Sequence, residues 1–209
     1  MNELKNSLVE VRKAYRLLYD YQKKVLDLIN FIGSEFGRNY NGGYSKFCNS
    51  SPKNGKGNLG NWAWDWLNMY YYEFNFHDKN NKSYFSVLLL SDTGFYEAKE
   101  QDINLNDKLD LEKYKNAETS STKLYFVLGE NMWDCEGFLK NGCWEDPNFL
   151  LQESGVTEKD DKSGKMIFKS YNLDRFSSQE NAILNLEDFS NFCQKNNLDF
   201  KLKKDMETD

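Results

Sequence analysis

The apolar positions of the first 32 residues follow a seven-residue repeat. Apolar side chains recur with steps that alternate between four and three residues, and Gln22 is the interruption. The stripe consists of Leu4, Leu8, Val11, Tyr15, Leu18, Val25, Ile29 and Ile32. This repeat predicts a long helix over residues 3–33, ended by Gly33. Neighbouring apolar residues widen the stripe, so we expect it to pack on the rest of the chain. The alternative is a dimeric coiled coil with Gln22 as a polar register residue.

A second pattern, in residues 61–76, places aromatic side chains at every second position. The even positions from Trp62 to Phe76 hold seven aromatic residues, with Asn68 between them. Because successive side chains of a strand point to opposite faces, these rings would line one face of an extended chain. The whole run exceeds an ordinary strand, so we expect a break near Asn68 and a strand over residues 70–76. A helix over residues 62–69 is the alternative, because Trp62, Trp66 and Met69 also lie at positions i, i+4 and i+7. The mixed odd positions predict a partly wetted face.

Apolar runs predict the remaining strands at 83–90, 94–100, 123–129 and 165–173. The first two flank a short polar turn that ends in Gly94, which indicates a hairpin. Residues 84–90 are apolar on both faces, so that strand should be central in its sheet. The polar segment 153–164 reads as a hairpin loop or an insertion. Asn185 is a candidate cap for a C-terminal helix over residues 185–197.

These elements together favour an α+β fold. We expect one domain over residues 1–209, with a mainly antiparallel sheet of about five strands inside residues 62–173. The long N-terminal helix and the C-terminal helix would pack on this sheet. The strand–helix alternation of a doubly wound parallel sheet is absent from the pattern.

Composition and charge narrow the location and the partners. The chain has 209 residues and a formal net charge of −6, so no global basic field draws it to nucleic acid or anionic lipid. It has no long apolar run and no secretion signal at its start, which predicts a cytoplasmic protein without membrane contact. Its cysteines are then reduced, and their spacing together with a single histidine argues against a structural zinc site. We expect no metal and no cofactor.

Residues 36–61 interrupt every periodicity. They contain six glycines and four basic residues but no acidic residue, so this segment carries +4 while the rest of the chain carries −10. Long loops without structure of their own are often functional. Glycine-rich backbone and lysines can hold an anion, and aromatic rings can stack on a base or sugar. The candidate ligand-binding residues are Arg38, Lys46, Lys53, Lys56, Trp62 and Trp64.

Catalytic motifs are weak in this sequence. The loop around Lys56 lacks the Ser or Thr that follows the lysine of a phosphate-binding loop, and no strand precedes it. Glu97 and Lys99 match the end of a PD-(D/E)xK nuclease pattern, but such a tripeptide is common by chance in a charged chain. His77 is the sole histidine and follows a predicted strand end. We assign no catalytic residue.

The leading hypothesis is a non-catalytic, cytoplasmic binding protein that acts on another protein or protein complex. Its acidic surface and its basic loop would meet the partner, and an inhibitor or accessory factor in bacterial defence or mobile-element conflict suits this composition. The alternative is a protein or enzyme that binds a phosphate ligand, a nucleotide or a nucleic acid through residues 36–64.

Overall fold

The computed structural model describes residues 2–46, 71–77, 83–101, 110–132 and 150–203. Within them, three α-helices and a six-stranded antiparallel sheet confirm the α+β class. The strand order is β1-β2-β3-β4-β6-β5, and all neighbouring strands are antiparallel. The strands are β1 (Asn39–Lys46), β2 (Tyr71–His77), β3 (Ser83–Leu90), β4 (Lys123–Glu130), β5 (Ser154–Glu158) and β6 (Lys165–Asn172).

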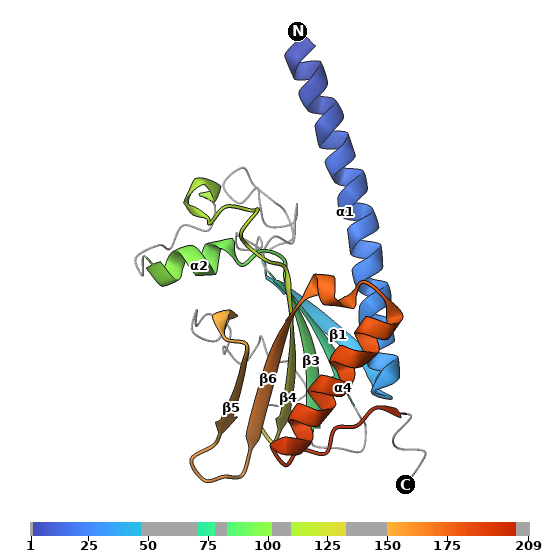
Figure 1. Ribbon diagram of the computed structural model, residues 1–209, viewed down its shortest axis with the longest axis vertical. Coiled ribbons are helices and arrows are strands. Elements are labelled where there is room, and N and C mark those ends of the chain that lie inside the picture. Colours follow the sequence, from blue (N-terminus) through green and yellow to red (C-terminus); the bar gives the residue numbers. More distant parts are fainter. Residues whose placement is uncertain (1, 47–70, 78–82, 102–109, 133–149, 204–209) are drawn as a thin grey trace, which may run out of the picture.

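Helices lie on both sides of this sheet (Figure 1). α1 (Asn2–Glu35) and α4 (Gln179–Lys195) contribute to one apolar cluster, together with one face of the central strands. α2 (Gly94–Gln101) contributes to a second cluster on the opposite face. Two 3-10 helices, η2 (Leu111–Lys113) and η4 (Leu173–Phe176), complete the described elements. No helix in the described ranges has an apolar stretch long enough to cross a bilayer.

The predicted aromatic wall is confirmed where the structure describes it. Phe74 and Phe76 are buried, and their rings join the cluster that receives the C-terminal end of α1. Phe76 packs on Phe85 of β3 with ring centroids 5.6 Å apart. The first part of the aromatic run, including the expected break near Asn68, lies outside the described residues.

The opposite face of β2 is drier than the sequence predicts. Glu73 is completely buried and Asn75 is nearly so. The hydroxyl oxygen of Ser86 on β3 lies 3.1 Å from Glu73 Oε1 and 2.7 Å from Asn75 Oδ1. The expectation of a partly wetted face was therefore wrong. The polar side chains on this face are buried and are hydrogen-bonded to one another.

The hairpin predicted after β3 is wrong, because residues 94–101 form helix α2. Thr93 starts this helix: its N–H donates to the carbonyl of Ser121 at 3.0 Å, and its own carbonyl accepts from Glu97 N–H at 3.0 Å. Asp92 accepts from Gly94 N–H at 2.7 Å, which satisfies one of the free donors of the first turn. Phe95 and Tyr96, adjacent in sequence, are both buried in the second cluster.

Two edge strands were also missed. With the predicted strand at 94–100 replaced by helix α2, four predicted and two unpredicted strands make up the six-stranded sheet. Residues 39–46, assigned to a loop, form β1, which pairs with β2 through a register shift between Tyr40 and Gly43. Gly42, at φ 88°, supplies the left-handed backbone of this bulge. At the other edge, half of the predicted polar loop forms β5, and an ion pair of 3.0 Å joins Glu158 to Lys165 of β6.

The bounds of both long helices differ from the prediction: α1 ends later and α4 begins earlier. α1 passes through Gly33 to Glu35, and the chain turns at Gly37, which has a φ of 61°. α4 begins six residues before Asn185, and its cap is Ser178, whose side chain accepts from Asn181 N–H. Asn185 is buried inside the helix, where its amide donates to two backbone carbonyls.

Candidate functional site: the projecting arm of α1

Most of α1 extends away from the sheet (Figure 1). We call residues 2–24 the arm and residues 25–35 the base. At about 1.5 Å per residue, the arm is roughly 35 Å long. The base is buried, because Val25, Ile29 and Ile32 pack into the same cluster as α4 and the aromatic wall. The two parts share one apolar stripe, which the described protein covers in the base. Within the arm, Tyr21 near the junction is partly buried against the same cluster.

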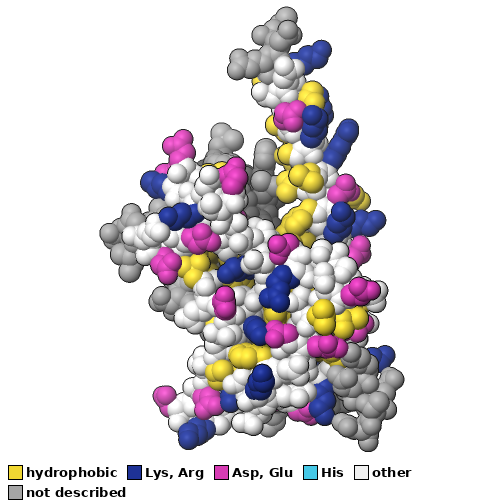
Figure 2. All heavy atoms as spheres, in the orientation of Figure 1, with side chains coloured by type: hydrophobic (Ala, Val, Ile, Leu, Met, Phe, Trp, Pro, Cys, Tyr) yellow, Lys and Arg dark blue, Asp and Glu magenta, His cyan; other side chains and the backbone are white. Residues whose placement is uncertain are grey.

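The stripe of the arm is exposed to solvent. Its five apolar residues, which we call the seam, have exposed fractions between 39% and 68%. The seam consists of Leu4, Leu8, Val11, Tyr15 and Leu18. Figure 2 shows apolar side chains gathered along one side of the arm, with basic side chains beside them. Contiguous exposed apolar surface on a soluble protein is typical of an interaction site.

The flank beside the seam is basic. At 100° per residue, four basic residues fall within about 40° of one another around the helix axis. We call them the basic flank: Lys5, Arg12, Arg16 and Lys23. On the opposite flank, the heptad positions that mirror Lys5 and Arg12 hold the neutral residues Ser7, Ala14 and Tyr21, whereas the positions that mirror Arg16 and Lys23 hold Glu3, Glu10, Leu17 and Lys24. Glu10 pairs with Lys13, which lies opposite the seam, at 2.8 Å, three residues away on the same helix. The arm thus presents an apolar seam bordered by positive charge on one side.

Tyr21 marks the point where the arm meets the sheet. Burial raises the pKa of its phenol, whereas a hydrogen bond with the side chain of Ser91, at the end of β3, acts in the opposite direction. Beyond Tyr21 towards the N-terminus, every described side chain of α1 except that of Val9 is exposed. The described protein therefore leaves the seam exposed over residues 4–18 of the arm.

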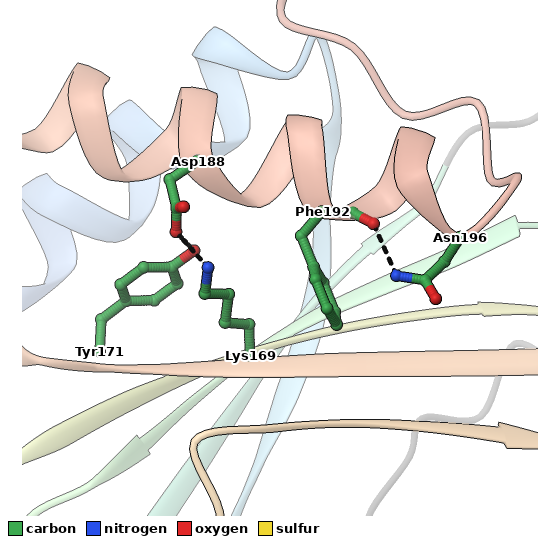
Figure 3. Close-up of polar contacts among 5 residues, drawn as sticks. All are labelled: Lys169, Tyr171, Asp188, Phe192 and Asn196. Atoms are coloured by element: carbon green, nitrogen blue, oxygen red, sulfur yellow. Dashed lines mark hydrogen bonds and ion pairs between the residues drawn. The ribbon is translucent and has the colours of Figure 1, made fainter.

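A polar clasp joins α4 to β6 at a separate place (Figure 3). Lys169 Nζ lies 2.6 Å from Asp188 Oδ2, and the Tyr171 hydroxyl donates to the same oxygen at 2.7 Å. The ammonium group also lies 5.5 Å from the ring centroid of Phe192. At the C-terminal cap of α4, the side-chain amide of Asn196 donates to the carbonyl of Phe192 at 2.8 Å. Lys169 is thus held between a carboxylate and aromatic rings.

The charges in this clasp are mutually satisfied. Burial and the adjacent Asp188 raise the pKa of Tyr171, so the phenol stays protonated and donates. For Asp188, burial opposes ionisation, but hydrogen bonds from Lys169 and Tyr171 outweigh it and lower the pKa of the carboxyl. We interpret the clasp as a structural contact that orients α4.

Comparison with known proteins gives a family. The sequence model of the PM0109 family matches residues 1–199. The chain belongs to the PM0109 family. The "Uncharacterized protein PM0109" of Pasteurella multocida (strain Pm70) is 59% identical over 34 residues, which cover 16% of this chain and 17% of that protein. No solved structure matches the chain.

The predicted ligand-binding residues are not brought together in the described part of this PM0109-family protein. Arg38 follows α1, is partly buried, and places its guanidinium 5.4 Å from the ring centroid of Phe200. Lys46 ends β1, at the edge of the sheet. The other four candidates lie outside the described residues: Lys53, Lys56, Trp62 and Trp64. The basic-loop site stays a prediction.

The remaining residues of chemical interest, Glu97, Lys99 and Cys193, lie on helices of the fold. Glu97 and Lys99 lie on helix α2 rather than on a strand of the nuclease pattern, and Glu97 accepts a hydrogen bond from the Thr93 hydroxyl. Cys193 is free and buried, and its burial raises the pKa of its thiol. Among the side chains that the structure describes, no group of three or more His, Cys, Asp or Glu residues is placed to hold a metal ion.

The exposure of the seam in this PM0109-family protein differs from the packing that its sequence pattern predicts. The heptad pattern identifies the seam residues. The alternative of a dimeric coiled coil predicts that a second helix covers them. The preference for packing within the chain is correct for the base and wrong for the arm. The lengths of the elements indicate this exposure. A helix of 34 residues is longer than the strands, which have eight residues or fewer, so the sheet cannot cover the whole helix.

Proposed function

We propose that this protein is a non-catalytic binding protein that acts on another protein or protein complex through the arm of α1. The observation that supports the proposal is the exposed seam on a helix that projects beyond the sheet. An isolated helix gains little from propensity alone, and an amphipathic helix is stabilised mainly by covering its apolar face. A helix that docks in a groove, or pairs with another helix, is anchored through such i, i+3, i+4, i+7 positions.

In this proposal the protein works in the cytoplasm, as an inhibitor or accessory factor of a larger system. The base and the sheet hold the arm in a fixed direction, while the seam provides the contact. The seam residues are not part of the buried cluster. Substitutions in the seam should therefore change binding without unfolding the protein. The proposal can therefore be tested with folded variants.

The test compares two triple variants in cross-linking and co-purification from cells that express the protein. Leu8→Gln/Val11→Gln/Leu18→Gln removes the seam, and Glu10→Gln/Lys13→Gln/Asp20→Asn changes polar positions of the same arm. We expect the seam variant to lose the proteins that the wild type captures and the polar variant to retain them. Circular dichroism and thermal unfolding serve as controls for the fold. Capture of the same proteins by a folded seam variant would contradict the proposal.

A further inference from the structure

The charge beside the seam restricts what can lie on it. Helices that pair through an a/d seam bring their flanking residues together at the edges of the contact. On the arm, one of these edges is the basic flank, of which Lys5, Arg12 and Arg16 are exposed next to the seam. A partner with acidic residues at the matching edge gains attraction there, whereas a basic partner is repelled.

A second copy of this chain matches the seam poorly. In an antiparallel pair, the basic flanks of two arms would lie against each other, with Arg12 near its own counterpart. In a parallel pair, both bodies would lie at the same end, where the sheet of each protomer already covers the stripe at Val25, Ile29 and Ile32. Neither arrangement combines apolar cover with charge balance.

The extent of the contact follows from the fold. The sheet begins to cover α1 near Tyr21, so a helix on the seam has about 20 residues of arm available, or roughly 30 Å. The seam itself follows the a/d pattern of helix pairing, and Leu17 and Tyr19, which are exposed outside it, add to the apolar surface of the arm. Glu10 and Asp20, which lie away from the seam, are typical of a water-exposed face.

We infer that the partner of the arm is an amphipathic helix of another protein, about 20 residues long, with an apolar seam flanked by Glu or Asp. This inference rests on the proposed function and adds the chemistry of the partner. The apolar contact supplies the area, and the acidic edge opposite Lys5, Arg12 and Arg16 supplies selectivity.

Two synthetic peptides test the inference with the full-length protein. Both have 21 residues with Leu at the a and d positions; one has Glu at the e and g positions and the other has Lys. Fluorescence anisotropy with trace labelled peptide measures each Kd at about 50 mM and about 500 mM salt. We expect the Glu peptide to bind at least about tenfold more tightly at low salt, and the ratio to shrink at high salt. Lys5→Glu/Arg12→Glu/Arg16→Glu should reverse the preference.

The outcomes separate the inference from the proposed function. Equal binding of both peptides, lost in Leu8→Gln/Val11→Gln/Leu18→Gln, would overturn the acidic partner and leave a protein-binding seam. Binding of neither peptide would overturn the inference, and so would an arm-dependent dimer in analytical ultracentrifugation. Seam-dependent binding to phosphatidylcholine–phosphatidylserine vesicles, without peptide binding, would overturn the inference and the proposed function together.

Discussion

The arm and the base of α1 carry the same apolar repeat in opposite environments. Ile32 in the base is fully buried, whereas Leu8 in the arm is 48% exposed, although both lie on the apolar stripe of one unbroken helix. In the base the stripe meets the aromatic wall of the sheet, and in the arm it meets solvent. The difference shows that a heptad pattern specifies an apolar face, while the surrounding fold decides whether that face serves stability or recognition.

The largest effect that tests this comparison is expected in the base. Ile32→Ala should lower the free energy of unfolding by about 3 kcal/mol, because it removes buried methyl groups and leaves a cavity between α1 and the sheet. Urea denaturation followed by circular dichroism measures the loss.

Leu8→Ala is the matched change in the arm. It should alter the free energy of unfolding by less than about 0.5 kcal/mol, since Leu8 loses little cover that the folded protein provides. A loss at Leu8 as large as that at Ile32 would show that the arm is covered in solution.

The next effect tests how closely the base approaches the sheet. A Cβ atom on Gly33 would lie 2.3 Å from Cε1 of Phe76, and that ring is itself packed on Phe85. Gly33→Ala should therefore destabilise the protein by about 1–2 kcal/mol, although alanine is the better helix former. Ser34→Ala, on the exposed side of the same turn, should have almost no effect. Thermal unfolding compares the two variants, and a more stable Gly33→Ala protein would contradict the close approach.

The elements with a strong local period were predictable from sequence. The helix predicted over residues 3–33 is observed as Asn2–Glu35, because the heptad repeat is a property of adjacent turns. The strands β2, β3, β4 and β6 were also predicted, since alternation or continuous apolar content persists over seven or eight residues in each.

The errors arose where distant contacts decide the structure. Residues 94–101 are too few to show a period, and the backbone of Ser121, far along the chain, holds Thr93 at the start of α2. β1 and β5 lie at the edges of the sheet, where pairing with one neighbour makes strands of polar and glycine-rich segments. The exposure of the seam depends likewise on where the sheet ends, which no local pattern contains.

A smaller loss of stability than those at Ile32 and Gly33 is expected at Tyr21, the residue of the arm where the described protein begins to cover α1. Tyr21→Phe removes the hydrogen bond with Ser91 and should cost about 1 kcal/mol of unfolding free energy at pH 8. Because burial raises the pKa of Tyr21 above its ordinary value of 10.0, the unfolded chain ionises first as the pH rises. The stabilisation is therefore complete below pH 10 and declines above it, and the difference between wild type and Tyr21→Phe should shrink. Urea unfolding of both proteins at pH 8 and about pH 10.5 measures this change. A difference that grows with pH would contradict this prediction, because it would mean that the phenol ionises more easily in the folded protein than in the unfolded chain.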